Sequence, residues 1–197
     1  MRNFKISGIV GLIFVFSHAF SQQFVVQTEG WVWQANSPYF EAENENQLRL
    51  NAPAQSGSSY ISTHFERSDK ATWEFRIQMD FQPSNQNYTD VYLMADRPEL
   101  HLPLNGYCLR IGTNQRNLSL FRQNGLRNDM VLLATGAANR INFNQVIIIV
   151  KVERDSAGQW KVFSRFEGAQ DFQPELETND NHFRHCTHFG FWCQYTA

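Results

Sequence analysis

Charged residues are scarce in this sequence: Lys, Arg, Asp and Glu make up 18% of its 197 residues, and the formal net charge is −2. No block of basic residues stands out that would attract a phosphate backbone, so we expect no nucleic-acid partner. Beyond the N-terminal segment, no apolar run approaches the roughly 20 residues of a membrane-spanning helix. The longest candidate, residues 146–152, is interrupted by Lys151. We therefore expect no membrane span in the mature chain.

Cysteine is also rare, with three residues, Cys108, Cys186 and Cys193. An odd number leaves at least one thiol unpaired even in an oxidising compartment. A chain of this length, with 42% hydrophobic and 14% aromatic residues, does not need a disulfide to stabilise its core. The sequence leaves the pairing of the thiols open. It has no Gly-x-Ser-x-Gly motif and no catalytic cysteine signature, so we expect buried, inert thiols.

Helical periodicity is missing too, because no stretch places apolar residues at 3.6-residue spacing between capping residues. From Phe24 onward, apolar and polar residues alternate instead, and Gly, Asn, Asp and Pro punctuate the alternation. In residues 73–81 every odd-numbered position is apolar and every even-numbered position is polar. This pattern predicts a strand with one buried face.

The same pattern predicts further strands at residues 47–51, 59–63, 88–95, 106–112, 117–123, 130–134, 146–154, 160–165 and 188–195. Asn124-Gly125 predicts a tight hairpin turn, because both residue types tolerate positive φ. Residues 173–180 (QPELETND) are expected to form a loop. Short strands at regular spacing predict an all-β fold, an antiparallel two-sheet jelly-roll sandwich formed by residues 22–197 as one domain.

The N-terminus has the three parts of a secretory signal peptide. Arg2 and Lys5 precede the apolar residues 6–16, and small residues occupy the −3 and −1 positions of a cut after Ser21. The alternative, a membrane anchor, is disfavoured because spanning a bilayer takes roughly 20 apolar residues. We therefore expect residues 1–21 to be removed and the mature chain to be secreted or displayed at the cell surface.

Several segments resemble a known family: TWEFRIQMDFQPSNQNYTDVYLMAD, NGYCLRIG, LSLFRQNG, VIIIVKVERDSAGQWKVFS and HFGFWCQYT. They are similar to the concanavalin A-like, laminin G-like (lectin-glucanase) jelly-roll domain at the N-terminus of secreted bacterial cell-surface multidomain proteins. The resemblance covers residues 24–197 and implies the jelly-roll fold and a role at the bacterial surface. It consists of strand patterns without a catalytic signature.

Two departures from that family stand out. Gln22-Gln23-Phe24 occupies the place of its usual acidic Asp-Asp-Phe-type strand, so carboxylates for a calcium site are not present there. The family also continues into a final strand that pairs near the first, whereas this sequence stops at Ala197. An unpaired edge inside a sandwich is costly. We therefore expect a sequence truncated at its C-terminus, with the closing strand and any downstream modules missing.

The sequence offers no pair of catalytic carboxylates. Retaining glycoside hydrolases need two carboxylates about 5–5.5 Å apart, and laminarinase-type members of the superfamily carry them in a Glu-x-Asp-x-x-Glu run that is missing here. Glu74 and Asp80 share a strand face but stand six residues apart. Glu175 and Glu177 fall in the expected loop. We therefore predict no catalytic residue and no enzymatic activity.

Five potential zinc ligands fall close together, namely His182, His185, Cys186, His188 and Cys193. Their spacing matches no zinc finger, and Cys186 and Cys193 fall on opposite faces of an extended segment. We therefore expect no metal and no cofactor, with His182, His185 and His188 as weak candidates only.

Binding is the remaining interpretation. Tyr92 and Arg110 alternate with the apolar residues on either side of them, which places both on a sheet surface facing solvent. Further aromatic candidates are Tyr88, Trp31, Trp33 and Tyr39. The alternative is that these aromatic residues fill the core. An aromatic platform with polar neighbours suits a sugar, so Tyr88, Tyr92 and Arg110 are the candidate ligand-binding residues.

The resulting prediction is a non-catalytic recognition module that binds carbohydrate or a cell-surface partner. One alternative is a structural spacer that presents missing C-terminal modules. A second alternative is a glycoside hydrolase-like enzyme. The same architecture hosts all three kinds of protein.

Overall fold

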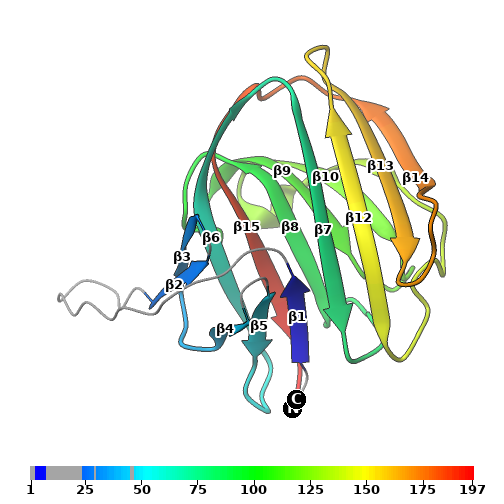
Figure 1. Ribbon diagram of the computed structural model, residues 1–197. Coiled ribbons are helices and arrows are strands. Elements are labelled where there is room, and N and C mark those ends of the chain that lie inside the picture. Colours follow the sequence, from blue (N-terminus) through cyan, green and yellow to red (C-terminus); the bar gives the residue numbers. More distant parts are fainter. Residues whose placement is uncertain (1–2, 8–23, 29, 45–46) are drawn as a thin grey trace.

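The computed structural model describes residues 3–7, 24–28, 30–44 and 47–197. Within them, the strands form two antiparallel sheets that face each other, and the single helical element is the short 3₁₀ helix η1 (Arg127–Asp129) (Figure 1). This confirms the predicted all-β jelly-roll sandwich.

The seven-stranded sheet has the order β14-β13-β12-β7-β1-β5-β4. Its strands are β14 (Gln173–Asn179), β13 (Gln159–Phe166), β12 (Val146–Arg154), β7 (Ala71–Met79), β1 (Asn3–Ser7), β5 (Gln47–Asn51) and β4 (Phe40–Asn44). The eight-stranded sheet has the order β11-β10-β9-β8-β15-β6-β3-β2. Its strands are β11 (Val131–Thr135), β10 (Leu118–Gly125), β9 (Leu104–Ile111), β8 (Tyr88–Ala95), β15 (His185–Tyr195), β6 (Gly57–Ser68), β3 (Trp31–Ala35) and β2 (Phe24–Thr28).

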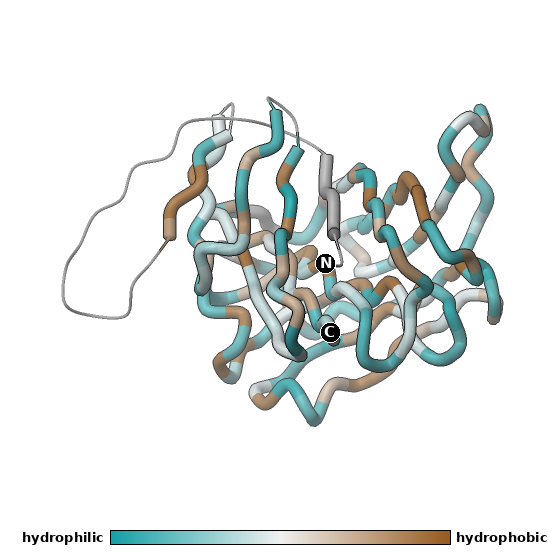
Figure 2. The backbone as a smooth tube through the Cα atoms, turned by 90° about the horizontal axis from the view of Figure 1, so that it is seen from below, coloured by the Kyte–Doolittle hydropathy of each residue, from teal (hydrophilic) through white to brown (hydrophobic). Residues whose placement is uncertain are grey.

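The main core lies between the sheets and follows the predicted alternation. In β7 the side chains of Trp73, Phe75, Ile77 and Met79 are buried, and in β12 every second side chain from Val146 onward is buried. Figure 2 shows the short alternation of hydrophobic and hydrophilic residues along the strands. Because each buried strand face contributes large aliphatic and aromatic side chains, their removal from water drives the packing of one sheet on the other.

The eight-stranded sheet also buries part of its outer face. In β8 all seven residues after Tyr88 are buried, so both faces of this strand are covered. The segment after β10, which contains η1, and the loop between β8 and β9 contribute to a second, smaller cluster on that face. Its buried members are Tyr60, Tyr92, Ala95, Leu100, Leu104, Cys108 and Trp192, with Tyr88, Phe121 and Met130 packed against them.

Two local predictions are wrong. Residues 173–179 form strand β14, at the edge of the seven-stranded sheet, where they pair with β13. An edge strand tolerates Pro174 because one side of its backbone needs no partner. Asn124 and Gly125 form no two-residue turn, since they extend β10 against Asn105 and Leu104 of β9. Gly125 has a φ of 87°, and the chain passes through η1 before β11 begins.

Strand β1 lies within the predicted signal peptide, between β5 and β7. The position between these two strands is therefore filled, and neither β5 nor β7 has a free edge there. The predicted cleavage site after Ser21 lies outside the described residues, so the signal peptide stays a prediction. No helix in the described parts of the chain is long and apolar enough to cross a membrane.

The three cysteines are buried and unbridged. Cys186 and Cys193 lie in the same core cluster, contrary to the expectation that they fall on opposite faces. The reason is an irregularity in β15 between Cys186 and His188, where the pairing with β6 shifts register. An extra residue in a strand reverses which side chains face the core.

Gly106 generates a prediction about packing. A Cβ atom at this position would lie 1.9 Å from the carbonyl oxygen of Met94, where the pairing of β8 with β9 shifts register. Gly106→Ala should therefore lower the free energy of unfolding by about 3 kcal/mol. Neither β8 nor β9 can move away from the added methyl group without breaking the hydrogen bonds that pair the two strands. Urea denaturation followed by circular dichroism measures this loss.

Gly57→Ala provides the control. The nearest atoms to its Cβ belong to the side chain of Tyr195, at 3.1 Å, and a side chain can shift. A loss at Gly106 no larger than that at Gly57 would contradict the explanation.

Candidate binding site

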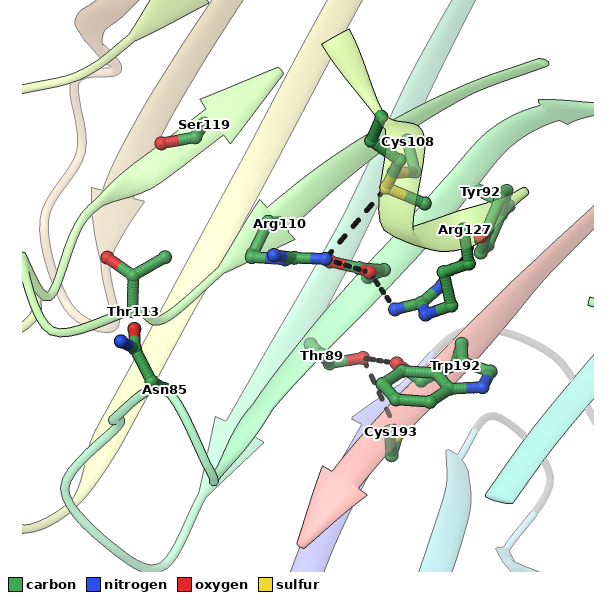
Figure 3. A network of polar contacts seen from close by, with 12 residues as sticks. Asn85, Thr89, Tyr92, Cys108, Arg110, Thr113, Ser119, Arg127, Trp192 and Cys193 are labelled. Carbon is green, nitrogen blue, oxygen red and sulfur yellow. Dashed lines mark hydrogen bonds and ion pairs between the residues drawn. The ribbon is translucent and has the colours of Figure 1, made fainter. Parts of the chain in front are cut away.

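The candidate site is a group of side chains on the outer face of the eight-stranded sheet, and we call it the outer-face site. Figure 3 shows part of it, with Tyr92, Arg110, Arg127 and Trp192 labelled. It brings together residues from β8, β9, β10, β15 and η1. Its members are Tyr88, Asp90, Tyr92, Arg110, Phe121, Arg127 and Trp192. Asp90 of β8 stands directly opposite Arg110 of β9 on one side and Trp192 of β15 on the other. The strand register alone thus places three chemically different side chains next to one another.

A buried ion network holds the site together. The carboxylate of Asp90 has no exposed surface. Arg110 donates two hydrogen bonds to it, from Nε to Oδ1 at 2.7 Å and from Nη2 to Oδ2 at 2.8 Å. Arg127 also donates to Oδ2 through Nη2. Burial of Asp90 opposes its ionisation, but the charges and hydrogen bonds of Arg127 and Arg110 outweigh burial, so the pKa of Asp90 lies below its ordinary value.

Arg127 also covers an aromatic ring. Its guanidinium carbon lies 3.5 Å from the ring centroid of Trp192, as a cation on the face of an indole. Its Nη1 donates to the hydroxyl of Tyr92 at 2.6 Å, and that hydroxyl donates to Oε1 of Gln123 at 2.6 Å. These contacts of Arg127 attach the 3₁₀ segment to the sheet.

The predicted residue Tyr92 is on the predicted face, but it is buried. The sequence argument correctly placed Tyr92 away from the main core. It was wrong to expect contact with solvent, because Arg127 and Gln123 bond its hydroxyl and the outer-face cluster covers its ring. Burial raises the pKa of Tyr92 well above its ordinary value.

The more accessible part of the site is a stack of three groups. The guanidinium of Arg110 lies between two rings, 4.3 Å from the centroid of Tyr88 and 4.9 Å from that of Phe121. Tyr88 is half-buried, and the side chain of Arg110 is 20% exposed. The Tyr88 ring also approaches Trp192, with 5.8 Å between centroids. Tyr88 and Arg110, both predicted as binding residues, are therefore in direct contact.

The thiols near the site are inert at neutral pH. Cys108 is buried beside Met130, and burial raises the pKa of its thiol far above the ordinary value. Burial likewise raises the pKa of Cys193 to about 12. A nucleophilic cysteine needs a lowered pKa, so neither thiol supplies a nucleophile here.

The weak metal candidates do not come together. His182 is exposed beside the ring of Phe183, and His185 is exposed at the start of β15. His188 is half-buried against the ring of His64, and burial followed by the charge of His64 lowers its pKa. Among the described residues, no group of three His, Cys, Asp or Glu side chains is placed to hold a metal ion.

Three residues of the site, Asp90, Arg127 and Trp192, are not among those predicted from the sequence. Asp90 shares the alternation of Tyr88 and Tyr92, so its place on the outer face could have been deduced. Arg127 could not, because its segment follows the residues taken as a hairpin turn. Trp192 carries the phase of the outer face in β15, but phase alone does not distinguish it from a core aromatic.

The network predicts a pH-dependent contribution to stability. Asp90→Asn removes the buried carboxylate that neutralises two partly buried guanidinium groups, and it should cost about 3 kcal/mol of unfolding free energy at neutral pH. Because the pKa of Asp90 is lowered in the folded state, its contribution is present above the unfolded pKa and lost as pH falls through the folded pKa. Denaturation curves measured at a series of acidic pH values should show that the free energy of unfolding falls less steeply with decreasing pH in Asp90→Asn than in the unchanged protein.

Glu153→Gln is the matched control. Glu153 pairs with Lys151 at 2.8 Å, and its side chain is 42% exposed, so its loss should cost no more than about 1 kcal/mol. Equal effects at the two positions would show that the Asp90 network does not stabilise the fold.

Comparisons with known proteins find a similar fold among solved structures. No family model matches the sequence, and none of the curated proteins matches it. Solved structures do match. A carbohydrate-binding module, CBM66 from Bacillus subtilis, superposes with a TM-score of 0.58 and 13% identity over 83% of this chain and 88% of that one.

The exoplasmic/lumenal domain of VIP36, in its Ca²⁺/Man3GlcNAc-bound form, gives a TM-score of 0.59 and 14% identity over 84% and 77% of the two chains. A legume lectin-like domain from Entamoeba histolytica superposes with a TM-score of 0.50 and 9% identity, and the match covers 99% of this chain and 83% of that one. At these identities the similarity concerns the fold. The chain has the jelly-roll β-sandwich found in lectins and carbohydrate-binding modules.

Proposed function

We propose that this protein is an exported recognition module that binds a glycan at the outer-face site and does not transform it. The observation that carries the proposal is the stack of Tyr88, Arg110 and Phe121. It offers two aromatic rings and a fixed planar donor group on one partly exposed surface. A sugar presents apolar C–H faces and hydroxyl oxygens, which suit these two kinds of group.

The site is already organised for binding. Asp90 fixes the Arg110 guanidinium through two hydrogen bonds, so little side-chain freedom is left to lose when a ligand binds. The similarity to carbohydrate-binding modules and lectins supports the same role. Secretion is the second part of the proposal, and the tripartite N-terminal segment supports it.

The outer-face site is unsuited to glycoside hydrolysis. It contains one carboxylate, Asp90, whose two oxygens are both engaged by arginine. Hydrolysis needs a second carboxylate and a group that can donate a proton at the pH of reaction. The lowered pKa of Asp90 keeps it ionised. Glu175 lies on β14 of the other sheet, where its buried side chain accepts hydrogen bonds from Ser164 of β13 and from Arg140, which precedes β12.

A glycan array probed with the purified protein tests the proposal. We expect saturable binding to one class of sugar. Tyr88→Ala should weaken that binding about tenfold, equivalent to about 1.4 kcal/mol, because it removes one ring of the stack. Phe143→Ala should leave the affinity unchanged, since Phe143 is 50% exposed and contacts Phe166 of the seven-stranded sheet.

No binding anywhere on the array would favour a structural spacer over a recognition module. Equal losses for Tyr88→Ala and Phe143→Ala would place the ligand elsewhere on the protein.

A further inference from the structure

We infer that the glycan bound at the outer-face site is anionic, carrying a carboxylate or a sulfate ester. This rests on the proposed function and names its ligand class. The inference follows from a count of charges and hydrogen-bond donors on the outer face.

The charges at the site do not balance. Arg110 alone engages both carboxylate oxygens of Asp90, so these two residues form a complete neutral pair. Arg127 shares Oδ2 and adds a second positive charge. Asp129 lies two residues beyond Arg127, but it is exposed, so water and salt screen its charge. The outer-face site therefore holds a surplus of one positive charge.

Both guanidinium groups have donors to spare. Arg110 uses Nε and Nη2 for Asp90, and its Nη1 has no hydrogen-bond partner among the described residues. Arg127 uses both Nη atoms, and its Nε has none within the same part of the chain. The side chains are 20% and 16% exposed. A ligand can therefore approach these groups from solvent.

The surroundings strengthen the attraction to an anion. Aromatic rings of Tyr88, Phe121 and Trp192 lie against the two guanidinium groups and exclude water from their faces. A charge with little water around it interacts more strongly with an opposite charge. Guanidinium groups match the geometry of carboxylates and of ester-bound anions. A neutral sugar would leave the surplus charge unmatched.

Matched pairs of oligosaccharides test the inference. Oligomers of galacturonic, glucuronic, mannuronic and guluronic acid are compared with their carboxyl-reduced neutral counterparts, and sulfated galactan oligomers with desulfated ones, by calorimetry. We expect at least one anionic oligomer to bind about tenfold more tightly than its neutral counterpart, with the advantage shrinking at high salt. The pair that shows the advantage distinguishes a carboxylate from a sulfate ester.

Variants of Arg127 test the assignment to this site. Arg127→Gln should weaken binding of the anionic oligomer about tenfold and leave the neutral counterpart unaffected, whereas Arg127→Lys keeps the charge and should weaken it less than Arg127→Gln. Asp90 keeps both hydrogen bonds from Arg110 in these variants, and circular dichroism checks that they fold. Lys161→Gln, the same change of charge at a residue 47% exposed on the seven-stranded sheet, is the control.

The outcomes separate the two proposals. Neutral and anionic oligomers binding equally well would overturn the inference about charge and leave glycan binding in place. Equal losses in Arg127→Gln and Lys161→Gln would also overturn it, since a general charge effect would then explain the preference. Binding to none of the oligomers, with a silent glycan array, would overturn both.

Discussion

A carboxylate without exposed surface has to be neutralised within the protein, and this constraint organises the outer face of the eight-stranded sheet. Asp90 belongs to β8, which lies between β9 and β15, so its partners must come from adjoining strands or from a segment folded over the sheet. Arg110 arrives through the register of β9, and Arg127 arrives through η1. The same two arginines that neutralise Asp90 also lie against aromatic rings, Arg110 against Tyr88 and Arg127 against Trp192.

An antiparallel sheet commonly buries one face and leaves the other in water. Here β8 is covered on both faces, and the second cover includes residues of the segment after β10 and of the loop between β8 and β9. The result is a surface on which guanidinium donors lie against aromatic rings, and the sheet holds both kinds of group in fixed positions. Recognition sites benefit from such rigidity because binding then costs little conformational entropy.

The sequence predicted features that depend on neighbours along the chain. The alternation in residues 73–81 and the β-branched run at 146–154 each determine a strand locally, and the phase of Tyr92 and Arg110 determined their face. The sequence did not predict features that depend on residues far away along the chain. β14 contains Pro174 and acidic residues, and only its position at an edge makes it a strand. Arg127 depends on a carboxylate 37 positions earlier, which no local pattern reveals.

The predicted removal of residues 1–21 would alter the seven-stranded sheet, because these residues include β1. The five residues of this strand complete the seven-stranded sheet by joining β5 to β7, yet they belong to the segment with the character of a leader peptide. If a peptidase removes that segment, the sheet divides into a four-stranded part ending at β7 and a two-stranded part ending at β5. Both new borders expose unpaired amide and carbonyl groups, which bind other strands readily. A processed form of this chain would thus associate with other chains differently from the unprocessed form.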